Sequence, residues 1–549
     1  MWGVISLLFG LVLSVILLAW RGFRLLCKLV GITFKYSFIT CQWLLGNDSD
    51  SFGTARFARN QELKSAGFLN DQGLLLGEVA NHELHSGIDE HLLCVAPTKS
   101  GKTSSLVIPN LLRLPEASVV VNDPSGEAWA ITRRQRAKSG RVYCWAPFAP
   151  LTDCFNPLDF VQVGTPDEHD DVKVIVSLLV QDGGQGDDTF WNNQARNVLS
   201  GLIIYVLYAH PPERQTMAQV RHLLTISEEA FDEVLGNMIA CGHPLARRTA
   251  NNIQQMDSKL RSGVLATAKG ATEVWDSPRL TQATRKSDFN FGDLRMETAS
   301  VYLVVPPERL ATYYPAVALL AGLSIAAISR VAHQGNKRVV FMLDEFANLG
   351  RLKPAEAAIT IARKAGIQLC LFVQDFAQLR RVYGDTSETF SANCAAKVYF
   401  GVNEIRDAET VSKTLGTKTV NTRSSGHYVG LTDVMPERLN AGSGEAGRAL
   451  RTPDEVMNLN RDECLICHQS VRPILARKVF YQDKRFKGLW DAWDGRPPHA
   501  ELLDFQEAFV EQQRGKLLAL PQSTVILLPD ETDQGHLTSD ESDIEASAA

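Results

Sequence analysis

Seven short apolar runs lie between residues 91 and 401 of the chain, separated by stretches with helical spacing. The runs are HLLCVA (91–96), ASVVVND (117–123), RVYCWAP (141–147), ASVYLVVP (299–306), RVVFMLDE (338–345), IQLCLFVQ (367–374) and AKVYFG (396–401). Near-continuous runs rich in Val, Leu and Tyr are typical of parallel strands that are buried on both faces. The pattern therefore predicts an α/β fold built on a mostly parallel sheet.

Between residues 165 and 285 the apolar residues follow a helical spacing, and we find no convincing strand there. The recurring residues are Trp191, Ala195, Val198, Leu199, Leu202, Ile203 and Val206. Ser227 is a plausible N-cap for a further helix. We therefore expect an all-α domain at 165–285, inserted between a first part (47–164) and a second part (286–495) of the α/β domain.

The N-terminal run MWGVISLLFGLVLSVILLAW is uncharged and long enough to span a bilayer. It is followed by Arg21, Arg24, Lys28 and Lys35. The positive-inside rule places these charges in the cytoplasm. A second apolar stretch, 29–45, is interrupted by Lys35 and is either a poor second span or an interfacial helix. We expect a membrane anchor at 1–46, a cytoplasmic body whose later apolar runs are only of core-helix length, and a C-terminal helix with an acidic tail at 496–549.

Composition narrows the class of protein further. A chain of 549 residues is long enough for two or more domains, and a net charge of −6 argues against general coating of nucleic acid. The ten cysteines are scattered without a disulfide framework, which indicates a reducing compartment. CLICH (464–468) matches the pattern for haem attachment, but we favour one buried strand through ECLICHQSVRPILARKVFY (463–481).

The run at 91–96 leads into VAPTKSGKTSS, which has the strand, loop and helix start of a phosphate-binding loop. The residues predicted to bind ATP are Ala96, Pro97, Thr98, Lys99, Ser100, Gly101, Lys102, Thr103 and Ser104. Backbone N–H groups of such a loop point at the phosphates, and the helix N-terminus adds positive potential. Lys102 should reach the β- and γ-phosphates, and the Thr103 hydroxyl should bind Mg²⁺.

Ala96 stands where the G-x-x-x-x-G-K-[ST] consensus has its first glycine. Glycine there gives freedom in φ, which alanine lacks. Pro97 fixes its own φ and pushes the preceding residue toward extended conformations. We therefore predict that Ala96 is the last residue of its strand, in the β region, and that the turn begins at Pro97. A positive φ at Ala96 would contradict this prediction.

The run at 338–345 ends in Asp344 and Glu345, an acidic pair typical of a Walker B motif. Such a pair at the carboxyl end of a parallel strand lies in the crevice where ligands bind. We expect Asp344 to hold Mg²⁺ through water and Glu345 to polarise the attacking water. The next strand ends at Gln374, whose amide either contacts the γ-phosphate or caps the strand. Together the motifs predict a site for ATP and Mg²⁺.

In these motifs the chain resembles the TraG/TraD-type coupling ATPases of bacterial type IV secretion and conjugation. The matching pieces are APTKSGKT (96–103), NDPSGE (122–127), FNPL (155–158), LDEFANLG (343–350), VQDFAQLRRVYG (373–384) and RTPDEVMNL (451–459). The resemblance implies a RecA-like nucleotide-binding domain with an inserted all-α domain and an N-terminal transmembrane anchor in the bacterial inner membrane. It also implies a homo-hexamer, and it suggests Arg363 as an arginine finger that reaches a neighbour's γ-phosphate.

The resemblance implies that the protein recruits effector proteins or relaxase-bound DNA and passes them, using ATP, to the inner-membrane components of a secretion channel. The mild acidity of the chain leaves the choice between these substrates open. Two other functions share the motifs. One is a septal-type DNA translocase, which would carry a winged-helix DNA reader near its C-terminus, and the other is a nucleotide-gated receptor without a motor role.

Overall fold

The computed structural model describes residues 50–87, 89–181, 187–331, 333–361, 365–427 and 439–502, together with a few positions between 10 and 30. The predicted membrane anchor falls almost entirely outside these residues. Arg363 and the predicted acidic tail lie wholly outside them. The description below therefore concerns the α/β part, the helical part and the segments that join them.

In the described part of the chain, eleven strands form one sheet in the order β2-β1-β13-β12-β9-β3-β8-β7-β4-β6-β5. The seven strands from β9 to β5 are parallel, and each comes from one of the seven predicted runs. They are β3 (Leu92–Val95), β4 (Ser118–Asn122), β5 (Arg141–Trp145), β6 (Ala299–Leu303), β7 (Val339–Leu343), β8 (Ile367–Val373) and β9 (Ala396–Tyr399). The predicted α/β fold with a mostly parallel sheet is confirmed.

The other four strands extend the sheet from β9 in antiparallel fashion. They are β1 (Leu75–Val79), β2 (His82–His85), β12 (Glu463–His468) and β13 (Val471–Arg477). The prediction of a single strand through 463–481 is wrong, because the chain turns at Gln469 and Ser470 and His468 pairs with Val471. Cys464 and Cys467 are buried in β12, as the strand interpretation of CLICH requires.

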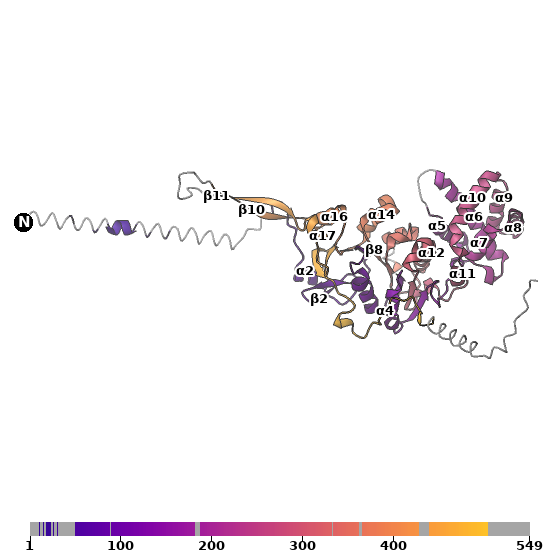
Figure 1. Ribbon diagram of the computed structural model, residues 1–549, viewed down its shortest axis with the longest axis horizontal. Coiled ribbons are helices and arrows are strands. Elements are labelled where there is room, and N and C mark those ends of the chain that lie inside the picture. Colours follow the sequence, from indigo (N-terminus) through magenta and orange to yellow (C-terminus); the bar gives the residue numbers. More distant parts are fainter. Residues whose placement is uncertain are drawn as a thin grey trace, which may run out of the picture.

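In the described residues between β5 and β6, seven α-helices lie toward one end of the molecule (Figure 1). They are α5 (Glu168–Leu179), α6 (Asp187–Ala209), α7 (Met217–Thr225), α8 (Glu228–Ala240), α9 (Pro244–Gln254), α10 (Ser258–Thr272) and α11 (Pro278–Ala283). Ser227 caps α8 as predicted, since its side chain accepts from the Ala230 N–H. The described residues between 165 and 285 contain no strand.

Both faces of the sheet are buried, and successive strand residues alternate between the two cores. Val120 faces one apolar cluster, whereas Val119 and Val121 face the other. On one side pack α3 (Ile108–Arg113) and α4 (Glu127–Arg136), and on the other α12 (Pro307–Arg330) and α13 (Lys353–Ile361). The pleat of a strand points successive side chains to opposite faces, so burial of both faces explains the continuous apolar runs.

Helix α12 is longer than the core helix predicted for its apolar run. Its 24 residues are long and apolar enough to cross a membrane by length and composition. However, 61% of its most apolar window is buried inside the fold. In the described part of the chain, α12 is therefore a helix of the protein core.

A two-stranded ribbon of β10 (Thr417–His427) and β11 (Leu439–Ala449) projects from the end of the molecule opposite the helical part (Figure 1). Its base pairs with the chain at Thr54, which bridges Lys418. The remaining helices are α2 (Asn60–Ser65), α14 (Phe376–Tyr383), α15 (Ser387–Asn393), α16 (Ile405–Leu415) and α17 (Pro453–Met457).

Candidate nucleotide-binding site

The predicted site residues meet at the carboxyl edge of four neighbouring parallel strands. β3, β8, β7 and β4 are adjacent in the sheet and run in the same direction. Their following loops carry the phosphate-binding motif, Gln374, the Asp344–Glu345 pair and Asp123. Because all four strands end at one edge, segments that are far apart in sequence build one crevice, as is general for open α/β sheets.

The loop after β3 has the backbone that phosphate binding requires. The Ala96 N–H donates to the Val373 carbonyl at 2.9 Å, so ladder bonding continues past Val95, where the strand ends. Ala96 has no positive φ, as predicted, although the strand ends one residue earlier than expected. The left-handed positions are Lys99, with φ 63°, and Gly101, with φ 88°. The turn therefore lies after Ala96, and the lack of glycine at position 96 causes no backbone strain.

The helix after the loop starts with one π-helical turn over Thr103–Val107 and continues as α3. Pro109 stands at the second position of α3 and has no N–H to donate to the carbonyl four residues earlier. The wider turn fits this missing hydrogen bond, because insertions in the helical ladder are typical where one partner is lacking. The Ser105 N–H donates to the Gly101 carbonyl at 2.9 Å, which joins the first turn of the helix to the end of the loop.

Ala96→Gly is expected to leave affinity for the predicted nucleotide within about twofold of the unaltered protein. Since Ala96 does not use a positive φ, glycine adds only backbone entropy, and we expect a loss of stability of about 0.5–1 kcal/mol. Titration with a fluorescent ATP analogue and thermal unfolding measure the two effects. A clear gain in affinity would mean that the loop needs a conformation that alanine prevents.

Lys102 lies between the two acidic residues of the second motif. Its Nζ is 3.1 Å from Asp344 Oδ1 and also forms an ion pair with Glu345 Oε1. Burial alone would lower the pKa of Lys102, but the two carboxylates outweigh burial and raise it. Burial raises the pKa of Asp344, and the neighbouring Glu345 adds to this effect despite the Lys102 ammonium. One cation thus balances two acidic groups in a largely enclosed site.

The remaining contacts orient the acidic pair. Gln374 Nε2 donates to Glu345 Oε2 at 2.8 Å, and Asn122 Nδ2 donates to the Asp344 carbonyl at 2.5 Å. Glu345 has a left-handed backbone with φ 53°, which is strained for a residue with a Cβ and is typical of functional sites. Sequence reasoning found Gln374 but gave no role to Asn122, although NDPSGE (122–127) contains it.

The Asp344 and Thr103 oxygens could share a magnesium ion. Thr103 Oγ1 donates to Asp344 Oδ2 at 3.4 Å. Mg²⁺ keeps several water ligands in proteins, so Thr103 Oγ1 can bind the metal directly while the neighbouring Asp344 binds it through one of these waters, as the sequence predicts. Hydroxyl and carboxylate oxygens are also the hard ligands that Mg²⁺ prefers. The spacing and the chemistry of these two groups therefore fit the predicted metal.

The NDPSGE segment forms the wall opposite the phosphate-binding loop. A cavity of about 650 Å³ lies between them, within the range of about 300–1,000 Å³ typical of small-molecule sites. Its lining includes Thr98, Lys99, Gly101, Lys102, Thr103, Ser104, Pro124, Ser125, Glu127, Leu310, Asp344, Glu345 and Asn348. Burial raises the pKa of Glu127, helped by Asp344. Burial also raises the pKa of Asp123, in the same segment, to about 7, although Asp123 accepts from the Trp129 N–H.

Comparison with known proteins identifies the family. Residues 56–517 match the family described as type IV secretory system conjugative DNA transfer. The chain belongs to this family. The conjugal transfer protein TraG of Escherichia coli is 27% identical over 453 residues, covering 74% of this chain and 71% of TraG. Protein VirD4 of Agrobacterium fabrum is 27% identical over 485 residues, covering 83% of this chain and 70% of VirD4. The predicted resemblance to the coupling proteins of type IV secretion is confirmed.

Solved structures of the conjugative coupling protein TrwB have the same fold. One matches with a TM-score of 0.61 at 17% identity, covering 82% of this chain and 99% of that chain. A second, in complex with a non-hydrolysable ATP analogue, matches with a TM-score of 0.61 at 18% identity, covering 81% and 98%. A third contains ADP and Mg²⁺ and matches with a TM-score of 0.60 at 17% identity, covering 80% and 97%. At this identity the likeness supports the mixed α/β fold with its helical insert.

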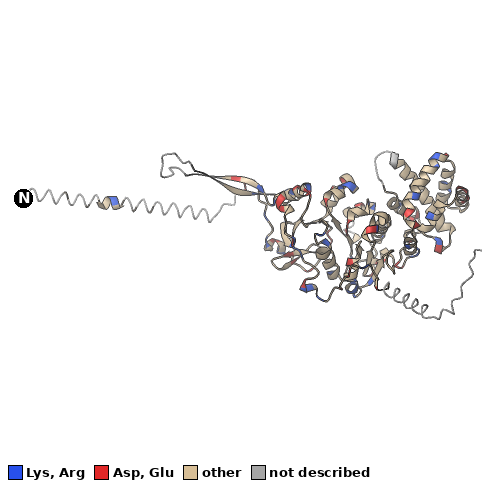
Figure 2. Ribbon diagram, viewed as in Figure 1, with Lys and Arg blue, Asp and Glu red and all other residues tan. Residues whose placement is uncertain are grey.

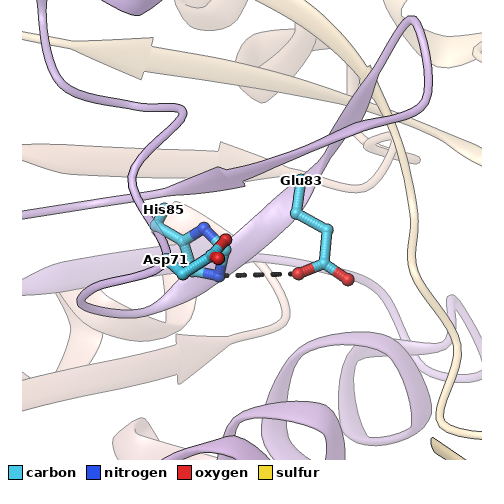
Figure 3. A group of neighbouring side chains, drawn as sticks. All are labelled: Asp71, Glu83 and His85. Atoms are coloured by element: carbon cyan, nitrogen blue, oxygen red, sulfur yellow. Dashed lines mark ion pairs between the residues drawn. The ribbon is translucent and has the colours of Figure 1, made fainter. Parts of the chain in front are cut away.

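A second group of potential metal ligands lies at one end of the sheet, on β2 and the loop before β1. Ligand atoms of Asp71, Glu83 and His85 lie within 4.8 Å of one another (Figure 3). However, Arg113 holds Glu83 with two hydrogen bonds of 2.8 and 3.0 Å, and Arg485 adds a third of 2.9 Å. Two guanidinium groups already neutralise this carboxylate and would repel a further cation. Glu83 therefore belongs to an ion-pair network that links β2 to α3 and to the chain after β13.

Proposed function

We propose that this protein is a magnesium-dependent ATPase of the bacterial inner membrane that couples substrates to a type IV secretion channel. The observation that carries the proposal is the meeting of Lys102 with Asp344 and Glu345 at the edge where the phosphate-binding loop ends. Two motifs separated by more than 200 residues build this arrangement. The complexes of TrwB with an ATP analogue, and with ADP and Mg²⁺, support the same assignment.

The contacts of Lys102 suggest how the site responds to ATP. Its ammonium balances Asp344 and Glu345, and on binding it turns to the β- and γ-phosphates. Asp344 and Thr103 then hold Mg²⁺, which supplies positive charge that stabilises the phosphate oxygens in the transition state. Free N–H groups of the loop and the first helical turn bind the remaining phosphate oxygens.

Once Lys102 has moved, Glu345 is free to take its role as general base. Its Oε2 accepts from Gln374 Nε2 at 2.8 Å, so the amide fixes the direction of the carboxylate. Glu345 accepts a proton from the attacking water as the γ-phosphate is cleaved. Gln374 links this base to β8 and to the γ-phosphate, and it is positioned to sense whether that phosphate is present.

Assembly into a homo-hexameric ring completes the site in this proposal. Arg363, which lies outside the described residues, supplies positive charge to the γ-phosphate of a neighbouring subunit. Such a finger acts only when the ring closes, which ties hydrolysis to assembly. An N-terminal anchor at 1–46 holds the ring against the inner-membrane components of the channel.

The substrate is relaxase-bound DNA, protein effectors, or both. Lys and Arg are interspersed with Asp and Glu over both the sheet part and the helical part (Figure 2). Recognition of a particular partner by the helical insert fits this mixed distribution better than general attraction of a polyanion, which needs clustered positive charge. The insert between β5 and β6 is the part that we propose reads the substrate.

The proposed function is tested with Asp344→Asn in the full-length protein. We expect ATP turnover to fall at least about 100-fold because the metal loses a charged ligand. ATP affinity of the unaltered protein should fall when EDTA removes Mg²⁺, whereas the affinity of the variant should hardly respond. Substrate transfer in cells should fail together with turnover.

The exposed Asp385 in the turn after α14 provides the matched control, since Asp385→Asn removes the same charge away from the site. This control should keep turnover, the response to EDTA and substrate transfer. If Asp344→Asn transferred substrate normally with turnover abolished, hydrolysis would not drive the process and the motor proposal would fail.

A further inference from the structure

The segment that follows β13 contacts the phosphate-binding loop at three places. Lys478 Nζ donates to the Ser100 carbonyl at 3.0 Å, and the Tyr481 N–H donates to the Ser104 carbonyl at 3.0 Å. Between them, the Phe480 ring lies 3.2 Å from the position that a Cβ on Gly101 would occupy. A part of the chain that is almost 380 residues away in the sequence thus holds the loop from outside the cavity.

Lys478 is an unusual residue for such a place because its charge is buried. The residue is only 5% exposed. Its Nζ donates to the Arg461 carbonyl at 2.8 Å and lies 4.2 Å from the centre of the Phe400 ring. Among the described residues no carboxylate lies within ion-pair distance of it. Burial of an ammonium without a carboxylate is costly. Among the described residues, two carbonyls and one aromatic ring are the groups that stabilise the Lys478 ammonium.

The bond from Lys478 fixes the orientation of the peptide between Ser100 and Gly101. In a trans peptide the C=O and the N–H point in opposite directions. When the Ser100 carbonyl points to Lys478, the Gly101 N–H must point the other way. Gly101 lines the cavity between the loop and the NDPSGE wall, whereas Lys478 is not part of that lining. The bond also polarises the peptide, which makes its N–H a stronger donor.

We propose that Lys478 is a positioning residue for nucleotide binding, whose buried ammonium holds the Ser100 carbonyl and aims the Gly101 N–H at the phosphates. This inference rests on the proposed function of the site. Ser100 Oγ is buried and has no hydrogen-bond partner among the described residues, so the side chain of Ser100 does not fix this peptide itself. The Phe480 ring and the Tyr481 N–H hold the loop next to this bond, at Gly101 and Ser104.

The protonation of Lys478 should then affect nucleotide affinity. Burial lowers the pKa of Lys478, while Cys464, Cys94 and Asp462 act in the opposite direction. Burial raises the pKa of the Cys464 thiol to about 12 and that of the Cys94 thiol still further. Both thiols are therefore neutral between pH 7 and 10, and they carry no charge that would offset the effect of burial on Lys478. As the pH rises toward the lowered pKa of Lys478, the ammonium loses its proton and its bond to Ser100 weakens. Affinity therefore falls as the pH rises.

The experiment compares Lys478→Met and Lys478→Arg in the full-length protein, with Lys487→Met as a matched control on an exposed lysine. Binding of a non-hydrolysable ATP analogue is measured from pH 7 to 10, with kcat and KM at pH 7.5. Lys478→Met should weaken binding about tenfold, the effect of one charge-assisted hydrogen bond. KM should rise by a similar factor, with a smaller change in kcat. Lys478→Arg should restore most of the affinity and remove its decline at high pH, because arginine stays charged.

Two results would overturn the inference. One is binding by Lys478→Met that equals that of the Lys487→Met control at every pH. The other is equal weakening in the Met and Arg variants with the high-pH decline unchanged, which would assign Lys478 to packing alone. Thermal unfolding without nucleotide shows whether Lys478→Met is folded. If it is not, Lys478→Gln is the second uncharged variant on which the same binding measurements are made. If the unaltered protein bound no ATP, the proposed function would fall and this inference with it, an outcome distinct from the other two.

Discussion

Lys102→Ala is expected to reduce ATP turnover and substrate transfer to background while the protein still reaches the membrane. The Lys102 ammonium is the positive charge that a phosphate-binding loop directs at the β- and γ-phosphates. Loss of a charge-assisted contact of this kind should weaken nucleotide binding about 10- to 100-fold. The remaining binding should show no catalysis, since the charge that develops in the transition state is no longer balanced. Undiminished transfer by this variant would contradict a motor role.

The structure adds a second effect of the same substitution. Lys102 is the counter-ion of Asp344 and Glu345, and its own side chain is only 10% exposed. Its removal leaves two largely enclosed carboxylates facing each other, and breaking such pairs typically costs about 3–5 kcal/mol when they are fully buried. These carboxylates keep some exposure, so we expect a smaller loss of stability.

Magnesium provides the test of this second effect. Without nucleotide, millimolar Mg²⁺ should raise the melting temperature of Lys102→Ala more than that of the unaltered protein, because the metal can take the place of the missing ammonium. A chloride salt of a monovalent cation at equal ionic strength is the control. If Mg²⁺ stabilised both proteins equally, Lys102 would not compete with the metal for the acidic pair.

The central part of the sheet could be predicted from the sequence because burial on both faces leaves a continuous apolar run. β1 and β2 could not, since their residues include Glu78, Glu83 and His85. The two glutamates are tolerated because Arg485 reaches them both, at 2.8 and 2.9 Å, from a position some 400 residues later. Such a partner has no local signal in the sequence. The same is true of the turn at Gln469, which carries neither glycine nor proline.

The candidate site, like the sheet, could be predicted from the sequence only in part. Lys102, Asp344 and Glu345 were found because phosphate and metal binding require fixed residue types directly after strands. The absence of a positive φ at Ala96 followed from Pro97 and from simple steric limits on φ, although the strand ends at Val95 and not at Ala96. Lys478 was not found, because its role depends on a contact with Ser100 across 378 positions. A lysine within a strand-like run gives no sign that its side chain will reach a distant carbonyl.

Glu345→Gln is expected to separate nucleotide binding from hydrolysis. Glutamine keeps the size of the side chain and can still accept from Gln374, but it cannot take a proton from water. Loss of a general base should lower kcat between about 100-fold and 10,000-fold. Binding of ATP should be unchanged or tighter, because one negative charge beside the polyphosphate is removed. Single-turnover hydrolysis and titration with an ATP analogue measure the two quantities.

The same variant distinguishes the motor from the nucleotide-gated receptor. Both require ATP to bind, so Lys102→Ala stops both, whereas Glu345→Gln leaves the bound state intact and removes only its conversion to ADP and phosphate. A motor needs that conversion for every cycle, so substrate transfer should fall as steeply as kcat. Continued transfer by Glu345→Gln, with hydrolysis verified as lost, would favour the receptor. Asp385→Asn again serves as the control for removal of an exposed charge.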